Sequence, residues 1–235
     1  PRSTLFPYTT LFRSGTFLTR PNRFLAMVQI GGQEVAAHVP DPGRLKELLI
    51  PGRRVYLERK HGKTRKTAYD LVLVDMEGTL VSVDSTLPND IVADALKRGF
   101  FPEVLKYPSF RREAQYGKSR LDFRLTDDKD GDAFIEVKSA SLVKEGLALF
   151  PDAPTIRGAR HLRELIDIRK KGHGAWVIFV IQREDAFKFS PNEGVDPIFA
   201  QALRAALDEG VGAMAYKCSV ALDRICLKER VPILI

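Results

Sequence analysis

The apolar run AWVIFVIQ, residues 175–182, constrains the fold more than any other stretch of the chain. It has the length of an ordinary strand, but it lacks the alternation of apolar and polar residues found where one face of a strand meets water. A strand of this kind is covered on both faces, as the strands of α/β domains are. Helical patterns flank it at 155–172, where Thr155 is a candidate N-cap and Gly172 ends the pattern, and at 197–210.

Three strand-like runs precede this core, namely FRREAQY (110–116), SRLDFRL (119–125) and AFIEVKS (133–139). A helical pattern starts at Ile91, and two more strand-like runs follow at 213–220 and 223–229. Helix, three strands, helix, strand, helix and two strands is the order of an α/β domain, which we predict over residues 85–235.

Short strand-like runs separated by glycines fill the chain before residue 85. The runs at 23–30 and 34–39 flank Gly31 and Gly32 and predict a hairpin. Three more runs follow, at 55–59, 68–76 and 79–84. Short strands at this regular spacing predict a small β-barrel of the OB type over residues 15–84. Between the strands, PDPGRLKELL (40–49) predicts a turn followed by one short helix.

The first 14 residues, PRSTLFPYTTLFRS, do not read as the start of a domain. They have no start methionine, no long apolar stretch and no small-residue cleavage site, so they do not predict a signal peptide. We interpret residues 1–14 as a non-native leader, of the kind that a cloning or sequencing adapter adds, and leave them out of the expected fold.

The charge and the cysteine content indicate the kind of binding partner and the cellular compartment of the protein. Thirty-seven Lys and Arg residues against 30 Asp and Glu give a formal net charge of +7, which favours a polyanionic partner such as nucleic acid. The two cysteines, Cys218 and Cys226, indicate a reducing compartment, the cytoplasm, rather than a disulfide framework. No apolar run reaches the ~20 residues of a membrane span, so we predict no membrane. The sequence also lacks a P-loop and a GxSxG motif, which excludes the usual nucleotide-dependent and serine-hydrolase chemistries.

Basic residues gather in RRVYLERKHGKTRK, residues 53–66, around a single acid, Glu58. They are Arg53, Arg54, Arg59, Lys60, Lys63, Arg65 and Lys66. One interpretation is a solvated hairpin tip; the other is a finger that contacts nucleic-acid phosphates, because Lys and Arg neutralise backbone charge without reading sequence. Arg157 and His161 lie one turn apart on the helix at 155–172, where they either contact phosphate as well or lie on a solvated helix face.

Charged residues also lie on two strands of the α/β domain, where a buried charge is costly unless it has a partner. The period of two puts Leu121, Phe123 and Leu125 of SRLDFRL on one face and Asp122 on the other. In AFIEVKS the same count puts Glu136 and Lys138 together. These strands therefore bring a carboxylate each toward a common face.

The hairpin of the first two strands would bring a third acid, Glu113, to the same face. Gly117–Lys118 has the form of a two-residue hairpin loop, which would pair Tyr116 with Ser119 and therefore Glu113 with Asp122. Two opposed carboxylates repel each other. A divalent cation between them makes the arrangement favourable, because Mg²⁺ and Mn²⁺ prefer oxygen ligands. We predict that Asp122, Glu136 and Glu113 hold such an ion; ordinary ion pairs with nearby arginines are the alternative. Asp152, in FPDAPT, either caps a turn or stands behind this site.

The order of elements around these residues resembles the PD-(D/E)XK nuclease core. Asp122, Glu136 and Lys138 match its motif residue by residue, and Glu113 is a looser match as an extra acid. The resemblance implies that the two matching acids hold a metal ion and that the lysine orients or activates water and offsets phosphate charge. It implies a catalytic set of Asp122, Glu136, Lys138 and Glu113.

Longer stretches identify a narrower resemblance. PDPGRLKELL, RREAQYGKSRLDF, IEVKSASLV and LFPDAPTIRGARHLRELI occur in the order in which the sugar fermentation stimulation protein family has similar stretches. That resemblance implies an OB-like domain followed by a nuclease-like α/β domain, DNA binding, and a link to maltose metabolism.

Three functions follow as alternatives. The first is a DNA-binding protein with a Mg²⁺- or Mn²⁺-dependent nuclease site. The second is a DNA-binding transcriptional regulator that uses the same fold without catalysis, and the third is a binder of sugar phosphates or partner proteins. No helix-turn-helix is evident, so we expect DNA binding with little sequence preference.

Overall fold

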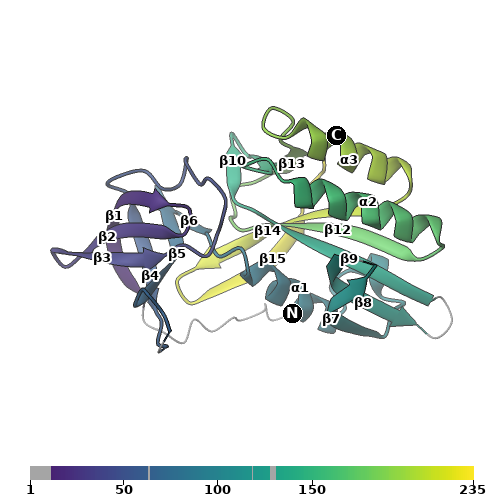
Figure 1. Cartoon of the computed structure of the whole chain (residues 1–235), viewed down its shortest axis with the longest axis horizontal. Helices are drawn as coiled ribbons and strands as arrows, with labels where there is room; N and C mark the ends of the chain where they lie inside the picture. Colours follow the sequence, from purple (N-terminus) through teal and green to yellow (C-terminus); the bar gives the residue numbers. More distant parts are fainter. Residues whose placement is uncertain (1–11, 63, 118, 128–130) are drawn as a thin grey trace.

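The computed structural model describes residues 12–62, 64–117, 119–127 and 131–235, and in it two β-rich domains lie side by side (Figure 1). The strands of the first domain are β1 (Arg13–Asn22), β2 (Leu25–Ile30), β3 (Gln33–His38), β4 (Arg54–Arg59), β5 (Tyr69–Met76) and β6 (Thr79–Ser82). They are ordered β3-β2-β1-β4-β5-β6, and β3 also pairs with β5, which closes five of them into a barrel. Alternate residues such as Val55 and Leu57 fill its interior. The predicted OB-type barrel is confirmed.

Two details of the barrel differ from the expectation. Residues 1–11 lie outside the described residues, but Arg13 and Ser14, which we left out of the fold, pair with Leu57 and Tyr56 of β4. The short helix expected within 40–49 is a single turn, in which Leu45 has a left-handed φ of 49°. A helix cannot run through that conformation, since consecutive residues must stay right-handed.

The second domain is built on a six-stranded sheet, ordered β15-β14-β12-β9-β8-β7. Its elements are α1 (Leu87–Lys97), the 3₁₀ turn η1 (Pro102–Val104), β7 (Ser109–Tyr116), β8 (Ser119–Asp127), β9 (Gly131–Ala140), β10 (Leu142–Lys144), β11 (Leu147–Phe150), α2 (Ile156–Lys170), β12 (Gly174–Ile181), β13 (Lys188–Pro191), α3 (Pro197–Asp208), β14 (Gly212–Ala221) and β15 (Arg224–Arg230). Helices α2 and α3 cover one face of the sheet and α1 the other, while β10, β11 and β13 form a small separate sheet (Figure 1). This is the predicted α/β arrangement.

Strand β12, the apolar run, occupies the middle of the sheet as its composition predicts. It pairs in parallel with both β9 and β14. Val177 and Phe179 pack in the core beneath α2 and α3, whereas Ile178 and Val180 pack in the core beneath α1. Helix α2 begins after Thr155, whose hydroxyl accepts a hydrogen bond from Gly158 N at 3.0 Å, so the predicted N-cap is present. None of the helices in the described ranges is long and apolar enough to cross a membrane.

The two domains share a packed interface. Val72 and Leu73 of β5 belong to the same buried cluster as Ile91 of α1. Polar contacts reinforce it, because Asp152 Oδ2 accepts a hydrogen bond from Leu45 N of the barrel at 3.1 Å. Asp152 therefore caps a turn, as one alternative predicted, and this turn lies in the barrel domain. The contact fixes the loop containing Leu45 against the second domain.

Candidate functional site

Asp122 lies where the pairing of β8 with β9 stops. The two strands pair as far as Phe123, which is opposite Ile135. Beyond that point Asp122 Oδ2 accepts a hydrogen bond from the backbone N–H of Val137 at an N–O distance of 2.7 Å. Asn89 Nδ2 of α1 donates to Asp122 Oδ1 at 2.8 Å. The side chain thus takes the place of a strand partner, and the carboxylate is held where the two strands part.

The side-chain alternation of β8 also changes at this position. The period of two predicts one face for Leu121, Phe123 and Leu125. Leu121 instead packs in the core beneath α2 and α3, while the other two pack in the core beneath α1. The expectation of a uniform face is wrong for Leu121, because the alternation of β8 shifts at Asp122, next to the position of β7 where the backbone is left-handed.

Glu113 is the residue that makes β7 irregular. The predicted pairing of Tyr116 with Ser119 is present, and Arg112 pairs with Phe123. Glu113 itself has a left-handed φ of 54°, and its side chain, 53% exposed, forms an ion pair with Arg120 at 2.8 Å. The predicted register holds on both sides of Glu113, since Arg112 pairs with Phe123 and Ala114 with Leu121, but the side chain of Glu113 is engaged by Arg120 instead of joining Asp122.

Glu136 is the most deeply buried acid of the group, with 3% of its surface exposed. Its Oε1 accepts a hydrogen bond from Lys138 Nζ at 2.5 Å and another from His161 Nδ1 of α2. Its Oε2 has no hydrogen-bond partner among the described residues, although it is shielded from water. A buried carboxylate oxygen in this state is costly unless a further group binds it.

The two acids differ in how readily they ionise. Burial, followed by the charge of Glu136, raises the pKa of Asp122 to about 6. Burial also opposes ionisation of Glu136, but the charge of Lys138 and the hydrogen bond from His161 outweigh it and lower the pKa of that carboxyl. At neutral pH two negative carboxylates thus lie together beside one lysine.

His161 stands behind Glu136 and does not face solvent. It is 1% exposed, and Arg157 Nε donates to its Nε2 at 3.2 Å. Because an arginine only donates, His161 Nε2 must be the acceptor and Nδ1 carries the proton that it donates to Glu136. The predicted phosphate contact does not suit a buried ring, so His161 instead orients the acid. Arg157 is exposed and remains able to contact a ligand.

Some basic side chains of residues 53–66 have partners within the protein, and others are exposed to solvent. Arg53 donates to the carbonyls of Glu47 and Leu48 and is fixed within the barrel loop, so it does not suit the predicted phosphate contact. Lys60 pairs with Glu58 at 2.7 Å, and Arg65 pairs with Asp70. Arg54, Arg59 and Lys66 are exposed, and they form no ion pair with another described residue; Lys63 lies outside the described residues.

Periodicity does not place two residues of the site, Asn89 and Gln182, although the position of Gln182 at the end of the apolar strand makes it a candidate. Asn89 is an ordinary polar residue in the first turn of α1, and only the packing of α1 on the sheet brings it to Asp122. Gln182 follows β12 and links the domains, because its Nε2 donates to both Ser139 Oγ and Asp84 O at 2.9 Å. Neither contact follows a local period, so periodicity could not have found them.

The residues suit a small hard cation. Two carboxylates approach each other, and one buried oxygen lacks a partner. Within the described ranges no three His, Cys, Asp or Glu side chains converge, so the protein would supply Asp122 and Glu136 only. Mg²⁺ is commonly bound by one or two carboxylates with water and phosphate oxygens completing its shell.

Comparison with known proteins gives the family. A family model described as "Sugar fermentation stimulation protein RE domain" matches residues 86–224, and another, "SfsA N-terminal OB domain", matches residues 18–83. The chain belongs to the sugar fermentation stimulation protein family.

Relatives in this family match the chain nearly end to end. The homologue of Clostridium tetani is 44% identical over 93% of this chain and 95% of its own length. That of Moorella thermoacetica is 48% identical over 87% and 89%. The solved structure of Pyrococcus furiosus SfsA in complex with Ca²⁺ covers 100% of both chains, at 31% identity and a TM-score of 0.90. The C-terminal domain therefore has the restriction-endonuclease-like fold, and the N-terminal domain is the OB barrel of the family.

Proposed function

We propose that this protein is a DNA-binding, divalent-metal-dependent nuclease that hydrolyses phosphodiester bonds at Asp122, Glu136 and Lys138. The observation that carries the proposal is the buried Oε2 of Glu136, which has no partner among the described residues and lies beside a second carboxylate. A buried carboxylate oxygen without a hydrogen bond is unfavourable, and a bound cation would both satisfy it and offset the charge of the second carboxylate.

Asp122 and Glu136 would hold Mg²⁺ or Mn²⁺. Glu113 is not part of the proposed set, because its side chain is engaged by Arg120. The Ca²⁺ in the structure of the Pyrococcus furiosus relative supports a divalent cation in a protein of this family. When bound, the ion would supply a water of lowered pKa and positive charge close to the phosphate.

The protein's own groups would perform the remaining steps. Lys138 keeps Glu136 ionised at a distance of 2.5 Å and has two further N–H donors for the attacking water or a phosphate oxygen. His161 fixes the orientation of Glu136, and Asn89 fixes that of Asp122. Asp122 needs to lose its proton before it can bind a metal ion, and it does so at neutral pH.

DNA would be held without sequence preference by the exposed Arg54, Arg59 and Lys66, with Arg157 close to the acids. The two cysteines are free and buried, which fits the reducing cytoplasm. An effect on sugar metabolism, which the family name suggests, would follow indirectly from action on DNA.

The test is a cleavage assay of the wild-type protein on plasmid, linear and branched DNA. We expect cleavage with Mg²⁺ or Mn²⁺ and none with a chelator. Salt-sensitive DNA binding without cleavage under any of these metals would contradict the nuclease and favour the regulator. Failure to bind DNA even at low salt would overturn both and leave a sugar-phosphate or protein ligand.

His161 gives a graded test of the metal site. His161→Ala should lower Mn²⁺ affinity by about 10- to 100-fold, the usual effect of losing a group that orients a metal ligand. His161→Asn should restore most of it, because its Nδ2 can donate as Nδ1 of histidine does. Titration calorimetry with exposed His61→Ala as the control measures the effect; equal affinity of wild type and His161→Ala would argue against the orienting role.

A further inference from the structure

One face of the barrel carries an aromatic platform among basic side chains. Phe24 is a large hydrophobic residue that is 48% exposed. Its ring stacks with that of His38, at a centroid distance of 6.3 Å and an interplanar angle of 22°. The two rings line a cavity of about 510 Å³ together with Arg65 and Lys66. Exposed aromatic rings beside cations are how OB folds bind successive unpaired bases.

Backbone contacts hold the platform in place. Phe24 N donates to Asn22 Oδ1 at 2.9 Å, and His38 Nδ1 donates to the carbonyl of Phe24 at 3.1 Å. Arg65 is fixed by Asp70 and by the carbonyl of Thr67. A base could therefore stack on Phe24 with little further ordering of the protein, which favours binding.

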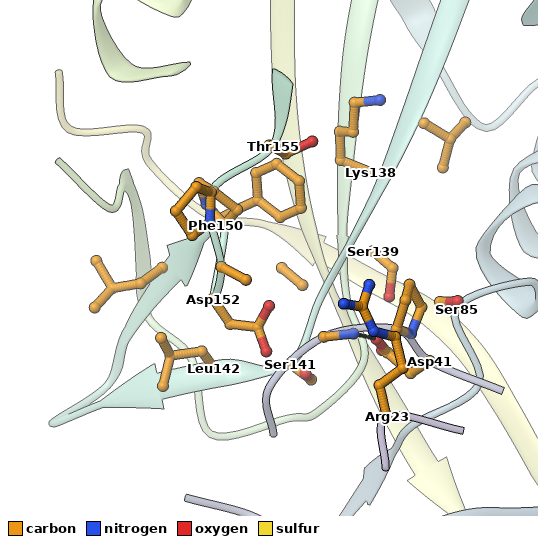
Figure 2. Close-up of a pocket in the computed structure, with 18 residues that line it drawn as sticks. Arg23, Asp41, Ser85, Lys138, Ser139, Ser141, Leu142, Phe150, Asp152 and Thr155 are labelled. Carbon is orange, nitrogen blue, oxygen red and sulfur yellow. Dashed lines mark hydrogen bonds between the residues drawn. The ribbon is translucent and has the colours of Figure 1, made fainter. Parts of the chain in front are cut away.

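The same turn connects the platform to the proposed active site. Arg23, the residue before Phe24, reaches from the barrel into a second cavity of about 360 Å³ between the domains, and Lys138 lies at its opposite end (Figure 2). The carbonyl of Arg23 accepts from Arg20 Nη2 at 2.6 Å, so the turn is anchored. Arg23 is exposed, and no ion pair joins its guanidinium to another described residue.

The lining of this second cavity suits a nucleotide better than a bare anion. Ser85, Ser139 and Ser141 contribute hydroxyls. Asp41 and Asp152 contribute carboxylates, each with an oxygen bonded to a backbone N–H of the barrel loop. Cations and hydroxyls suit a phosphate, whereas carboxylates repel phosphate but accept hydrogen bonds from the amino groups of bases.

We propose that the substrate class is single-stranded DNA, which stacks a base on Phe24 and His38 and runs past Arg23 to Lys138. Bases in a duplex are paired and stacked, so neither the ring face nor the cavity can take one without the cost of opening the helix. The inference rests on the proposed function for the end of this path at Lys138, while the platform itself concerns binding only.

The test measures binding without cleavage. Fluorescence anisotropy with a chelator present compares a single-stranded DNA oligonucleotide, the blunt duplex and the RNA of the same sequence. We expect single-stranded DNA to bind at least about tenfold more tightly than the duplex. Phe24→Ala should weaken it by about 5- to 150-fold, the range that corresponds to 1–3 kcal/mol for one stacked base. Phe24→Trp should retain affinity, and exposed Phe187→Ala should leave it unchanged.

A second measurement reports contact directly. The chain has one tryptophan, Trp176, so the added emission of Phe24→Trp can be read against the unsubstituted protein, and it should be quenched by single-stranded DNA. Equal affinity for duplex, tighter binding of RNA, no effect of Phe24→Ala or no quenching would each overturn the proposal. Because these measurements contain no metal ion, they test binding of single-stranded DNA independently of cleavage. A protein that never cleaves DNA can still bind it in this way, and a nuclease can fail to do so.

Discussion

Lys138→Met should lower the metal-dependent cleavage rate by about a thousandfold while the protein stays folded. Lys138 Nζ lies 2.5 Å from Glu136 Oε1 and its side chain is 12% exposed, so it is the one cation packed directly against the acid among the described residues. Removing its charge leaves burial to raise the pKa of Glu136, which weakens metal binding. It also removes the donor for water or phosphate, and losses of one such group typically cost about 10²- to 10³-fold in rate.

Methionine keeps the length of the lysine stem, so packing changes little. The matched control is Lys228→Met, an exposed lysine on β15, which should cleave like the wild type. Circular dichroism checks the fold, and the initial rate of cleavage at saturating Mn²⁺ gives the result. A Lys138→Met protein that cleaves within a few-fold of the wild type would remove the lysine from the mechanism.

Asp122→Asn should make the metal-free protein more stable above about pH 6 and inactive at every pH. The pKa of Asp122 is raised from its ordinary 3.8 to about 6, first by burial and then by Glu136. Above pH 6 the folded protein therefore carries a carboxylate that is less favourable than in the unfolded chain. The cost reaches about 3 kcal/mol, because each pH unit between the two pKa values contributes 1.36 kcal/mol.

Because the pKa of Asp122 is raised in the folded protein, the stability difference between the variant and the wild type depends on pH. Below pH 3.8 the carboxyl is neutral in both states and asparagine gains nothing; the advantage grows from pH 4 to pH 6 and is complete above. Asn89 can turn its amide to bond the new side chain. Urea unfolding in a chelator at pH 4.5 and pH 8 measures the difference, with exposed Asp223→Asn as the control. An Asn variant that is less stable at pH 8, or an advantage independent of pH, would contradict the assigned environment.

Local patterns predicted the parts of the structure that local interactions determine. The apolar run at β12 and the pairing of Tyr116 with Ser119 are where the sequence predicts them. The period of two also put Glu136 and Lys138 together, since β9 stays regular and pairs with β12 along its length. The pattern failed where a single residue departs from regular geometry, as at Glu113 with its left-handed backbone.

Contacts between distant segments were beyond the reach of periodicity. The helix expected after Pro42 has good helical residues, but Leu45 has a left-handed backbone and its N–H is hydrogen-bonded to Asp152 of the other domain. His161 was grouped with exposed basic residues because it lies on a polar helix stripe, yet that stripe faces the buried Glu136. Phe24 gave no signal at all, because one exposed ring becomes informative only when His38 and Lys66 lie beside it.

The most direct test of the metal site is the anomalous difference map of crystals soaked in Mn²⁺. A peak should lie between the carboxylates of Asp122 and Glu136, at about 2.0–2.5 Å from Glu136 Oε2, the distance range of hard cations from oxygen ligands. The same soak of Glu136→Gln should lose it. Well-diffracting wild-type crystals with no Mn²⁺ at this position, or with Mn²⁺ only at exposed acids such as Glu113, would contradict the account.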